Sequence, residues 1–369
     1  MPKEISIDCN SFEHGGDIYR VAAELKIQER KVIDFSSSVN PLGVSGKVKA
    51  EIRRNLKYLH NYPDPESTIM RKRLAHYHGL APETIICGNG STELIYLITR
   101  SLRPKKVLVT APTYSEYERA VLLQNITPSI TYFMLNKENC FEINPDEFIA
   151  TLRTPNSELH FDIAFLCNPN NPTGRLLKKG DVKRIADEAA ALKCCLVVDE
   201  AFIDYSPDNS VIQSVSRNPY LIVLRTMSNF YALSGLRVGY GVFPQHLVER
   251  LKEFKEPWSV NRLAQKAALT AIKDRAYKKE TYRLLDEEKR FLERNFRKLK
   301  IAFFPSDANF FLLKIENAAE ICRHLLKKGI LLRNCFNFKG LGENYMRVSI
   351  KSHRENAILV KELASLIVK

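Results

Sequence analysis

Short apolar runs that end in polar clusters recur through the first two thirds of the chain. They occupy residues 85–86, 107–110, 163–167, 196–198 and 221–224. Each run is followed by a cluster of Gly, Asn, Pro, Asp or Glu and then by a segment with helical periodicity. Buried parallel strands alternate with helices in this way, and their ligands lie off the carboxyl ends of the strands. We therefore predict an α/β fold with a mostly parallel central sheet and helices on both faces.

The pattern changes in the last third of the chain. A long charged helical region reaches from about residue 257 to 299, and strands near residues 309–313, 330–333 and 345–350 alternate with helices. A chain of 369 residues can bury one large core and a smaller second one. We predict a large domain of residues 46–264, and a smaller α+β domain formed by residues 1–45 and 265–369.

The formal net charge of +14 raises the possibility of a nucleic-acid partner. However, the Lys and Arg residues are spread through helical patterns and interleaved with Asp and Glu, instead of forming one stripe with aromatic residues. Part of the surplus could steer an anionic substrate into a cleft. The polar start and the absence of a long apolar run predict a cytoplasmic protein without a membrane or nucleic-acid partner.

The cysteines show no metal-binding spacing. They are Cys9, Cys87, Cys140, Cys167, Cys194, Cys195, Cys322 and Cys335, and several lie in apolar strand-like runs. His76 and His78 are two residues apart, so on a helix they point away from each other. We expect buried free thiols and no metal site.

Residues 224–241 combine hydroxyl groups, an amide, a Gly turn and an arginine directly after an apolar run. The segment resembles the lysine segment of the fold type I aminotransferase superfamily, Ser/Thr-x-x-Lys-x-x-x-x-x-Gly-Leu-Arg-x-Gly-Tyr. In that superfamily the lysine bonds covalently to pyridoxal 5′-phosphate (PLP). This chain has Asn229 at that position, and an amide nitrogen is not nucleophilic enough to condense with an aldehyde.

The resemblance gives roles to other residues in the same order along the chain. Asp199 would hold the pyridine nitrogen, Tyr114 would stack on the ring, and Asn171 would reach the phenolate oxygen. Asn229, Asp199 and Tyr114 are thus the catalytic candidates. The cofactor phosphate would be held by Gly90, Ser91, Thr92, Thr226, Ser228 and Arg237. Tyr62 would reach the phosphate bound by a neighbouring subunit, which implies a homodimer with shared sites.

Each of these residues also has a purely structural interpretation. Asp199 could cap a helix, Tyr114 could belong to the core, and Arg237 could be half of an ion pair. Their shared order and spacing across nearly the whole chain argue for the PLP pocket.

Within the superfamily the chain most resembles the L-threonine O-3-phosphate decarboxylases of cobalamin biosynthesis, relatives of the histidinol-phosphate aminotransferases. The resemblance rests on segments 14–16, 34–43, 199–204, 230–232 and 257–261. Phe202 is informative, because the aminotransferases usually carry a tyrosine there and the decarboxylases a phenylalanine.

The resemblance also implies a substrate, an O-phosphorylated amino acid such as phosphothreonine or phosphoserine. Arg347 would clamp its α-carboxylate and Arg333 would meet its phosphate, although both could instead form structural ion pairs. His14 and Gly15 would complete the phosphate pocket, and Asn171 would also face the substrate. Ser38 departs from the asparagine usual in the decarboxylases.

Asn229 leaves three explanations open: an engineered change, an enzyme in which another group moves protons, or a binding protein descended from an enzyme. The lysines closest along the chain, Lys193 and Lys252, lie outside the strand-end clusters. Loss of a positioned acid or base costs about 10²- to 10⁴-fold in rate, so the chain as written should be a poor catalyst. The alternatives to a decarboxylase are a histidinol-phosphate-type aminotransferase and a non-catalytic protein that binds PLP or a phosphoamino acid.

Overall fold

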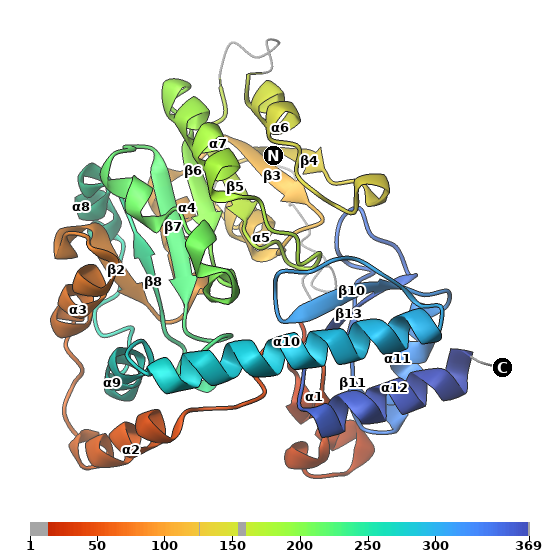
Figure 1. Ribbon diagram of the computed structural model, residues 1–369. Helices are drawn as coiled ribbons and strands as arrows, with labels where there is room; N and C mark the ends of the chain where they lie inside the picture. Colours follow the sequence, from red (N-terminus) through yellow and green to blue (C-terminus); the bar gives the residue numbers. More distant parts are fainter. Residues whose placement is uncertain (1–13, 125, 154–159, 368–369) are drawn as a thin grey trace, which may run out of the picture.

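A computed structural model describes residues 14–124, 126–153 and 160–367 (Figure 1). In these residues the central sheet has seven strands in the order β2-β8-β7-β6-β5-β3-β4. The strands are β2 (Ile85–Gly88), β3 (Lys106–Ala111), β4 (Ser129–Met134), β5 (Ile163–Cys167), β6 (Cys195–Asp199), β7 (Leu221–Thr226) and β8 (Gly239–Val242). Strands β4, β3, β5, β6 and β7 are parallel, and β8 runs antiparallel between β7 and β2. The predicted mostly parallel sheet is confirmed.

Helices cover both faces of this sheet, as predicted. The helices that pack on it are α3 (Thr68–His78), α4 (Ser91–Leu102), α5 (Glu116–Leu122), α6 (Pro145–Leu152), α7 (Lys179–Ala191) and α8 (Gln245–Glu253). In β5, Ala164 and Leu166 pack with residues of α6 and α7, whereas Ile163 and Phe165 pack with residues of α4, α5 and α8. Alternate strand residues therefore feed two separate cores.

The C-terminal part of the chain forms a second, smaller sheet. Its four antiparallel strands are ordered β12-β13-β10-β9 among the described residues. They are β9 (Ala302–Phe303), β10 (Phe310–Lys314), β12 (Arg333–Asn334) and β13 (Tyr345–Ser349). The helices of this part are α10 (Arg275–Lys298), α11 (Ala318–Lys327) and α12 (His353–Ile367). This is the α+β architecture expected for the smaller domain.

The N-terminal segment lies against the C-terminal part. Strand β1 (Ile33–Asp34), which follows α1 (Ile18–Leu25), pairs in parallel with β11 (Ile330–Leu331). Helix α2 (Gly46–Asn55) instead contacts α9 (Arg262–Ala271), beside the large sheet. The assignment of residues 1–45 to the smaller domain stays a prediction, and its residues 1–13 lie outside the described residues.

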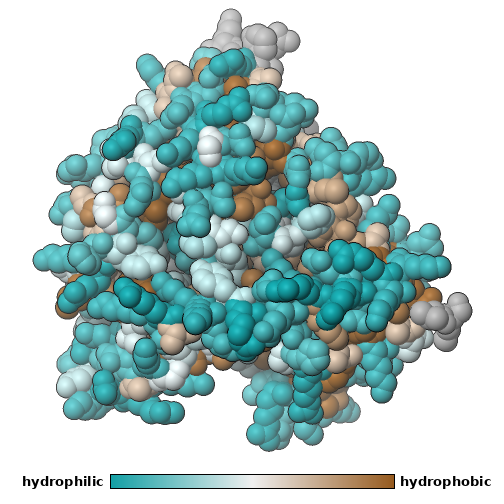
Figure 2. All heavy atoms as spheres, in the orientation of Figure 1, coloured by the Kyte–Doolittle hydropathy of each residue, from teal (hydrophilic) through white to brown (hydrophobic). Residues whose placement is uncertain are grey.

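The long helix α10 crosses the face of the molecule in Figure 1, and its surface is hydrophilic in Figure 2. Some of its basic side chains form ion pairs along the helix: Arg283 with Glu280 and Glu287, and Arg297 with Glu293. Such exposed pairs are worth little individually. They show that these basic residues are interleaved with acidic ones on a solvated helix face.

The prediction of buried free thiols is confirmed for Cys87, Cys167, Cys194, Cys195, Cys322 and Cys335. Cys140 is free and partly exposed, and Cys9 lies outside the described residues. In the described part of the chain, no three His, Cys, Asp or Glu side chains gather to hold a metal ion. No helix there is both long and apolar enough to cross a membrane.

Candidate active site

A cavity of about 280 Å³ opens between the carboxyl ends of the large sheet and the C-terminal part. It is lined by almost all of the residues that the sequence placed in a PLP pocket. They are His14, Gly15, Ser38, Ser91, Thr92, Tyr114, Asn171, Asp199, Thr226, Ser228, Asn229, Arg237, Arg333 and Arg347. Segments more than 300 residues apart in the chain thus meet in one site.

One end of the cavity has the features of a phosphate cup. Helix α4 begins at Ser91, so its free amide groups and the positive end of its dipole lie at this end. The preceding Gly90 has a φ of 82°, and a Cβ added there would overlap the guanidinium of Arg237. Thr226, at the end of β7, donates a hydrogen bond of 3.0 Å to Ser228, and both line the cavity. Amides, hydroxyls and a guanidinium together suit a dianionic phosphate.

Asp199, at the end of β6, is a carboxylate buried to 3% exposure. Burial raises its pKa to about 6, although two hydrogen bonds favour the ionised form. The backbone amide of Ala201 donates to Oδ1 at 3.0 Å, and the hydroxyl of Tyr117 donates to Oδ2 at 2.8 Å. A cation beside Asp199 would stabilise its charge, as a protonated pyridine nitrogen does.

Tyr114 presents an aromatic ring to the same cavity. The ring meets the edge of Tyr117 with centroids 5.6 Å apart, and Tyr117 in turn stacks on Phe165 at 5.0 Å. This aromatic series fixes Tyr114 as a wall of the cavity, which agrees with the stacking role expected for it.

The loops that follow β3 and β5 are tied to each other. Thr113 donates to Oδ1 of Asn170 at 2.8 Å, and Nδ2 of Asn170 donates to the carbonyl of Pro112 at 2.9 Å. All three residues are buried. Their contacts fix the neighbouring Asn171, whose Oδ1 accepts a hydrogen bond from Nη1 of Arg347.

Arg347 and Arg333 come from adjacent strands of the smaller sheet, and both are less than 10% exposed. Burial lowers the pKa of Arg347 to about 10. No carboxylate contacts it in the described part of the chain, and its Nε has no hydrogen-bond partner there. A buried cation in this state is strongly stabilised by an anionic ligand. Arg333 donates to the carbonyl of Asn334 and to Asn337, and its guanidinium lies 5.0 Å from the ring centre of Phe338.

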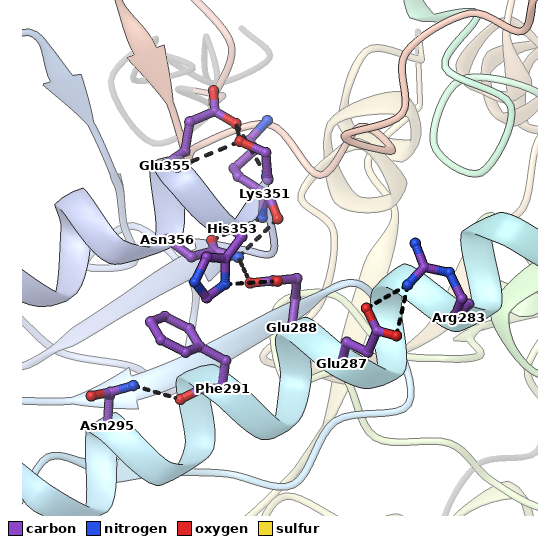
Figure 3. A network of polar contacts seen from close by, with 10 residues as sticks. Arg283, Glu287, Glu288, Phe291, Asn295, Lys351, His353, Glu355 and Asn356 are labelled. Atoms are coloured by element: carbon purple, nitrogen blue, oxygen red, sulfur yellow. Dashed lines mark hydrogen bonds and ion pairs between the residues drawn. The ribbon is translucent and has the colours of Figure 1, made fainter.

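A polar network anchors the turn that follows the arginine-bearing strand β13 (Figure 3). Glu288 of α10 accepts hydrogen bonds from Asn356 at 2.8 Å and from His353 at 3.0 Å. Asn356 also bonds to the backbone amide and carbonyl of Lys351. The Lys351 ammonium donates to the carbonyl of Ser37, while Arg347 donates to the carbonyl of Ser36. These contacts join the N-terminal segment to the end of the cavity that Arg347 lines.

Asn229 lies on the cavity wall, in the segment after β7. Its Nδ2 donates to the carbonyl of Ala201 at 3.3 Å, and its backbone carbonyl accepts from the amide of Asn40 at 2.9 Å. Asn40 also donates to the carbonyl of Phe230 and to Thr281, both at 2.8 Å. Among the described residues no lysine lines the cavity, and Lys193 and Lys252 lie outside its lining as well.

Two expected site residues do not line the cavity. Gly90 lies directly behind the phosphate end, against Arg237. Tyr62 lies elsewhere on the surface, 80% exposed and 5.3 Å from the ring of Trp258. Its predicted role concerns a second subunit and stays a prediction.

The sequence did not single out Tyr117, Asn40, Glu116 or Cys167. Tyr117 lies in the first turn of α5, three residues after Tyr114, and the two rings contact each other. That spacing could have identified it. The other contacts depend on how distant segments meet, and local pattern carries no signal for them.

The sheet order, and the cavity at the strand ends with Asp199 and Tyr114 in its wall, are those of the fold type I PLP-dependent enzymes. The chain belongs to the family of class I and II aminotransferases, which it matches over residues 30–363. PLP is the cofactor of this family, and the phosphate cup, buried carboxylate and aromatic wall described above fit it.

The relatives of this chain include proteins named as decarboxylases and proteins named as aminotransferases. The chain is 35% identical to a threonine-phosphate decarboxylase of Salmonella typhimurium, over 96% of each chain. It is 33% identical to a histidinol-phosphate aminotransferase of Methanocaldococcus jannaschii, over 94% of this chain and 92% of the relative. The crystal structure of the L-threonine-O-3-phosphate decarboxylase from Porphyromonas gingivalis matches with a TM-score of 0.80 at 25% identity, over 92% of this chain and 100% of that one.

Proposed function

We propose that the chain is a PLP-dependent decarboxylase of an O-phosphorylated amino acid, phosphothreonine or phosphoserine. Its product is an aminoalkyl phosphate, the kind of compound used to build the nucleotide loop of cobamides. Bound PLP supplies a protonated ring that withdraws electrons from the bonds at the substrate's Cα. The chain's own residues bind and orient the substrate.

The observation that carries the proposal is the pair of buried arginines opposite the cofactor end. Arg347 has no carboxylate partner among the described residues and lies beside Asn171, so it suits the α-carboxylate. Arg333 lies on the adjacent strand, lines the same cavity as His14, and suits the phosphate. A substrate with two anionic groups satisfies both cations.

Phe202 favours the decarboxylase over the aminotransferase. Its ring lines the cavity and packs edge-on against Phe310 at 5.1 Å. A phenylalanine offers no hydroxyl to the cofactor, whereas the related aminotransferases usually carry a tyrosine. Asn229 favours a second candidate function, a protein that binds PLP and phosphoamino acids without efficient turnover.

The test compares the wild type and Asn229→Lys, both loaded with PLP. Each is given phosphothreonine, phosphoserine or histidinol phosphate, and CO2 release and amino transfer to a keto acid are measured separately. We expect CO2 release from phosphothreonine or phosphoserine, slow in the wild type and about 10²- to 10⁴-fold faster in Asn229→Lys. Amino transfer from histidinol phosphate, with no CO2 released from phosphothreonine or phosphoserine, would overturn the proposal in favour of an aminotransferase.

We also propose that the active unit is a homodimer. Leu59, Tyr62 and Trp258 are 57%, 80% and 47% exposed, which is unusual for large apolar side chains. Tyr62 and Trp258 contact each other, so an association through this patch would carry Tyr62 toward a second subunit. Sedimentation should show a dimer, and Trp258→Glu should shift it toward monomer with weaker PLP binding. A stable wild-type monomer that binds PLP fully would contradict this.

A further inference from the structure

Behind the cavity wall lies a buried carboxylate that none of the roles above uses. Glu116, in the first turn of α5, is 3% exposed and accepts a hydrogen bond of 2.6 Å from the hydroxyl of Tyr96. Its other oxygen lies 2.7 Å from Nε2 of His14, which lines the cavity. Arg119 approaches the same oxygen at 3.5 Å. Glu116 is thus a buried carboxylate directed at one nitrogen of a cavity histidine.

This contact fixes which ring nitrogen of His14 carries hydrogen. Burial opposes ionisation of Glu116, but the hydrogen bonds from His14 and Tyr96 hold its pKa below the ordinary value. An ionised carboxylate can only accept, so Nε2 of His14 must be the donor. The ring nitrogen left for the cavity is Nδ1, which accepts a proton when His14 is neutral and donates one when it is charged.

The other groups on the cavity wall are poorly suited to move protons at neutral pH. Burial raises the pKa of Tyr114 and of Cys167 to about 12, and that of Tyr117 well above its usual range. Asp199 is held by Tyr117 and Ala201 at the place where the cofactor's ring nitrogen would bind. Asn229 provides no amine. His14 keeps one ring nitrogen that does not contact Glu116 and can accept or donate a proton.

We propose that His14, held by Glu116, is the proton-transfer group of this site and takes over the role that position 229 cannot perform. The proposal rests on the function proposed above. Glu116 acts as the positioning residue, and His14 is the catalytic residue. The arrangement extends the phosphate-binding role expected for His14, because a side chain near the phosphate end of a short substrate is also close to its Cα.

The proton balance of the step is complete within the site and solvent. When the bond between Cα and the carboxylate breaks, CO2 leaves and the bonding electron pair stays with the substrate. Cα then needs one proton, which Nδ1 of charged His14 donates. The neutral ring regains a proton from water, because the His14 side chain is 40% exposed. No oxidant, reductant or metal enters the step.

The first test does not depend on turnover. In protein without cofactor, ¹⁵N NMR of labelled histidines should show neutral His14 with hydrogen on Nε2. Glu116→Gln should remove this preference, since the amide can donate as well as accept. Glu118→Gln is the matched control: Glu118 lies on the same helix and accepts from Tyr132 at 2.7 Å, away from this cavity. Hydrogen on Nδ1 in the wild type would overturn the proposal.

The second test separates proton transfer from phosphate binding. With PLP and phosphothreonine, His14→Ala should lower kcat about 100-fold or more, and added imidazole should restore part of the loss. Glu116→Gln should lower kcat about tenfold, with KM changed less than about threefold, while Glu118→Gln should match the wild type. A raised KM with unchanged kcat in His14→Ala, not rescued by imidazole, would show that His14 only binds the phosphate and would overturn the proposal.

Failure of the His14 proposal can be distinguished from failure of the decarboxylase proposal. The measurement is exchange of the substrate's Cα hydrogen in D2O, made together with CO2 release. If Asn229→Lys decarboxylates but the wild type shows neither CO2 release nor exchange, the His14 proposal fails and the decarboxylase proposal stands. If amino transfer replaces CO2 release, the decarboxylase proposal fails. In that case, exchange that is lost in His14→Ala and restored by imidazole still supports His14 as the proton carrier.

Discussion

Asp199 is the residue whose chemistry is most strongly set by its surroundings. Its pKa of about 6 in the fold lies above its ordinary value of 3.8, so the folded protein without cofactor holds this proton more tightly than the unfolded chain does. The resulting stabilisation is fully present below about pH 4 and is lost as the pH rises through about 6. At 1.36 kcal/mol per pKa unit the loss is on the order of 2–3 kcal/mol.

Asp199→Asn should remove this pH dependence. We expect the free energy of unfolding of the cofactor-free wild type, measured with urea, to fall between pH 4 and pH 7 relative to the variant. The variant should also bind PLP at least about tenfold more weakly, because the partner of the ring nitrogen is gone. Equal pH dependence in the two proteins would show that the carboxylate is not perturbed as described.

Changes at Arg347 and Arg237 should weaken the binding of different ligands. Arg347→Lys keeps the charge but loses the planar fork, so phosphothreonine binding should weaken about 10- to 100-fold while PLP affinity changes less than about threefold. Arg237→Ala should instead weaken PLP itself. Fluorescence titration of PLP, followed by titration of the amino acid, measures both. Similar losses of PLP in the two variants would refute the assignment of Arg347 to the substrate.

At this scale, sequence identified the residues that carry the cofactor motif but not the residues that support them. Asp199, Tyr114 and Asn229 stand at strand ends in a recognisable order, and the structure brings them together. Tyr117 and Glu116 act through contacts between segments that only the fold brings together. The roles of all these residues toward ligands stay predictions that the variants above test.

At the scale of elements, the turn between β13 and α12 depends on a single buried amide. Asn356 is fully buried and bonds to Glu288 and to both backbone groups of Lys351 (Figure 3). Asn356→Ala should lower the free energy of unfolding by about 2–4 kcal/mol, because it leaves buried polar groups unpaired. Chemical denaturation measures the loss.

An exposed ion pair in Figure 3 provides the control for Asn356→Ala. Arg283 pairs with Glu287 on the exposed side of α10, so Arg283→Ala should cost less than about 1 kcal/mol (Figure 3). If Asn356→Ala costs no more than Arg283→Ala, the network does not anchor the turn.

In the central sheet, five strands were predicted from their apolar runs, and β4 and β8 were not. β4 lies at the edge of the sheet, and each of its residues from Ser129 to Met134 is exposed or half-buried, so it lacks the fully buried run of the central strands. β8 contains Gly239 and Gly241, and glycine is rare in strand interiors. A Cβ at Gly239 would collide with the amide of Ser91, so close packing against the phosphate cup explains that glycine. Both strands exist because of their neighbours in the sheet.

At the scale of the whole molecule, the site exists only where two parts of the chain meet. The large sheet lines the end of the cavity proposed for the cofactor, and β12, β13 and the N-terminal segment line the end proposed for the substrate. The sequence predicted this division because the repeated strand and helix units stop near residue 257. It could not predict the contacts across the cavity, such as Arg347 with Asn171, since they depend on how the parts pack.

The central claim is that this cavity binds PLP without a covalent bond, because residue 229 is an asparagine. The most direct measurement is the mass of the peptide that contains residue 229 after PLP-loaded protein is reduced with borohydride and digested. The wild-type peptide should be unmodified although PLP is bound, and the same peptide of Asn229→Lys should gain one pyridoxyl group. A pyridoxyl group on a wild-type lysine that depends on Asp199, or an unmodified peptide from Asn229→Lys with PLP bound, would contradict the account.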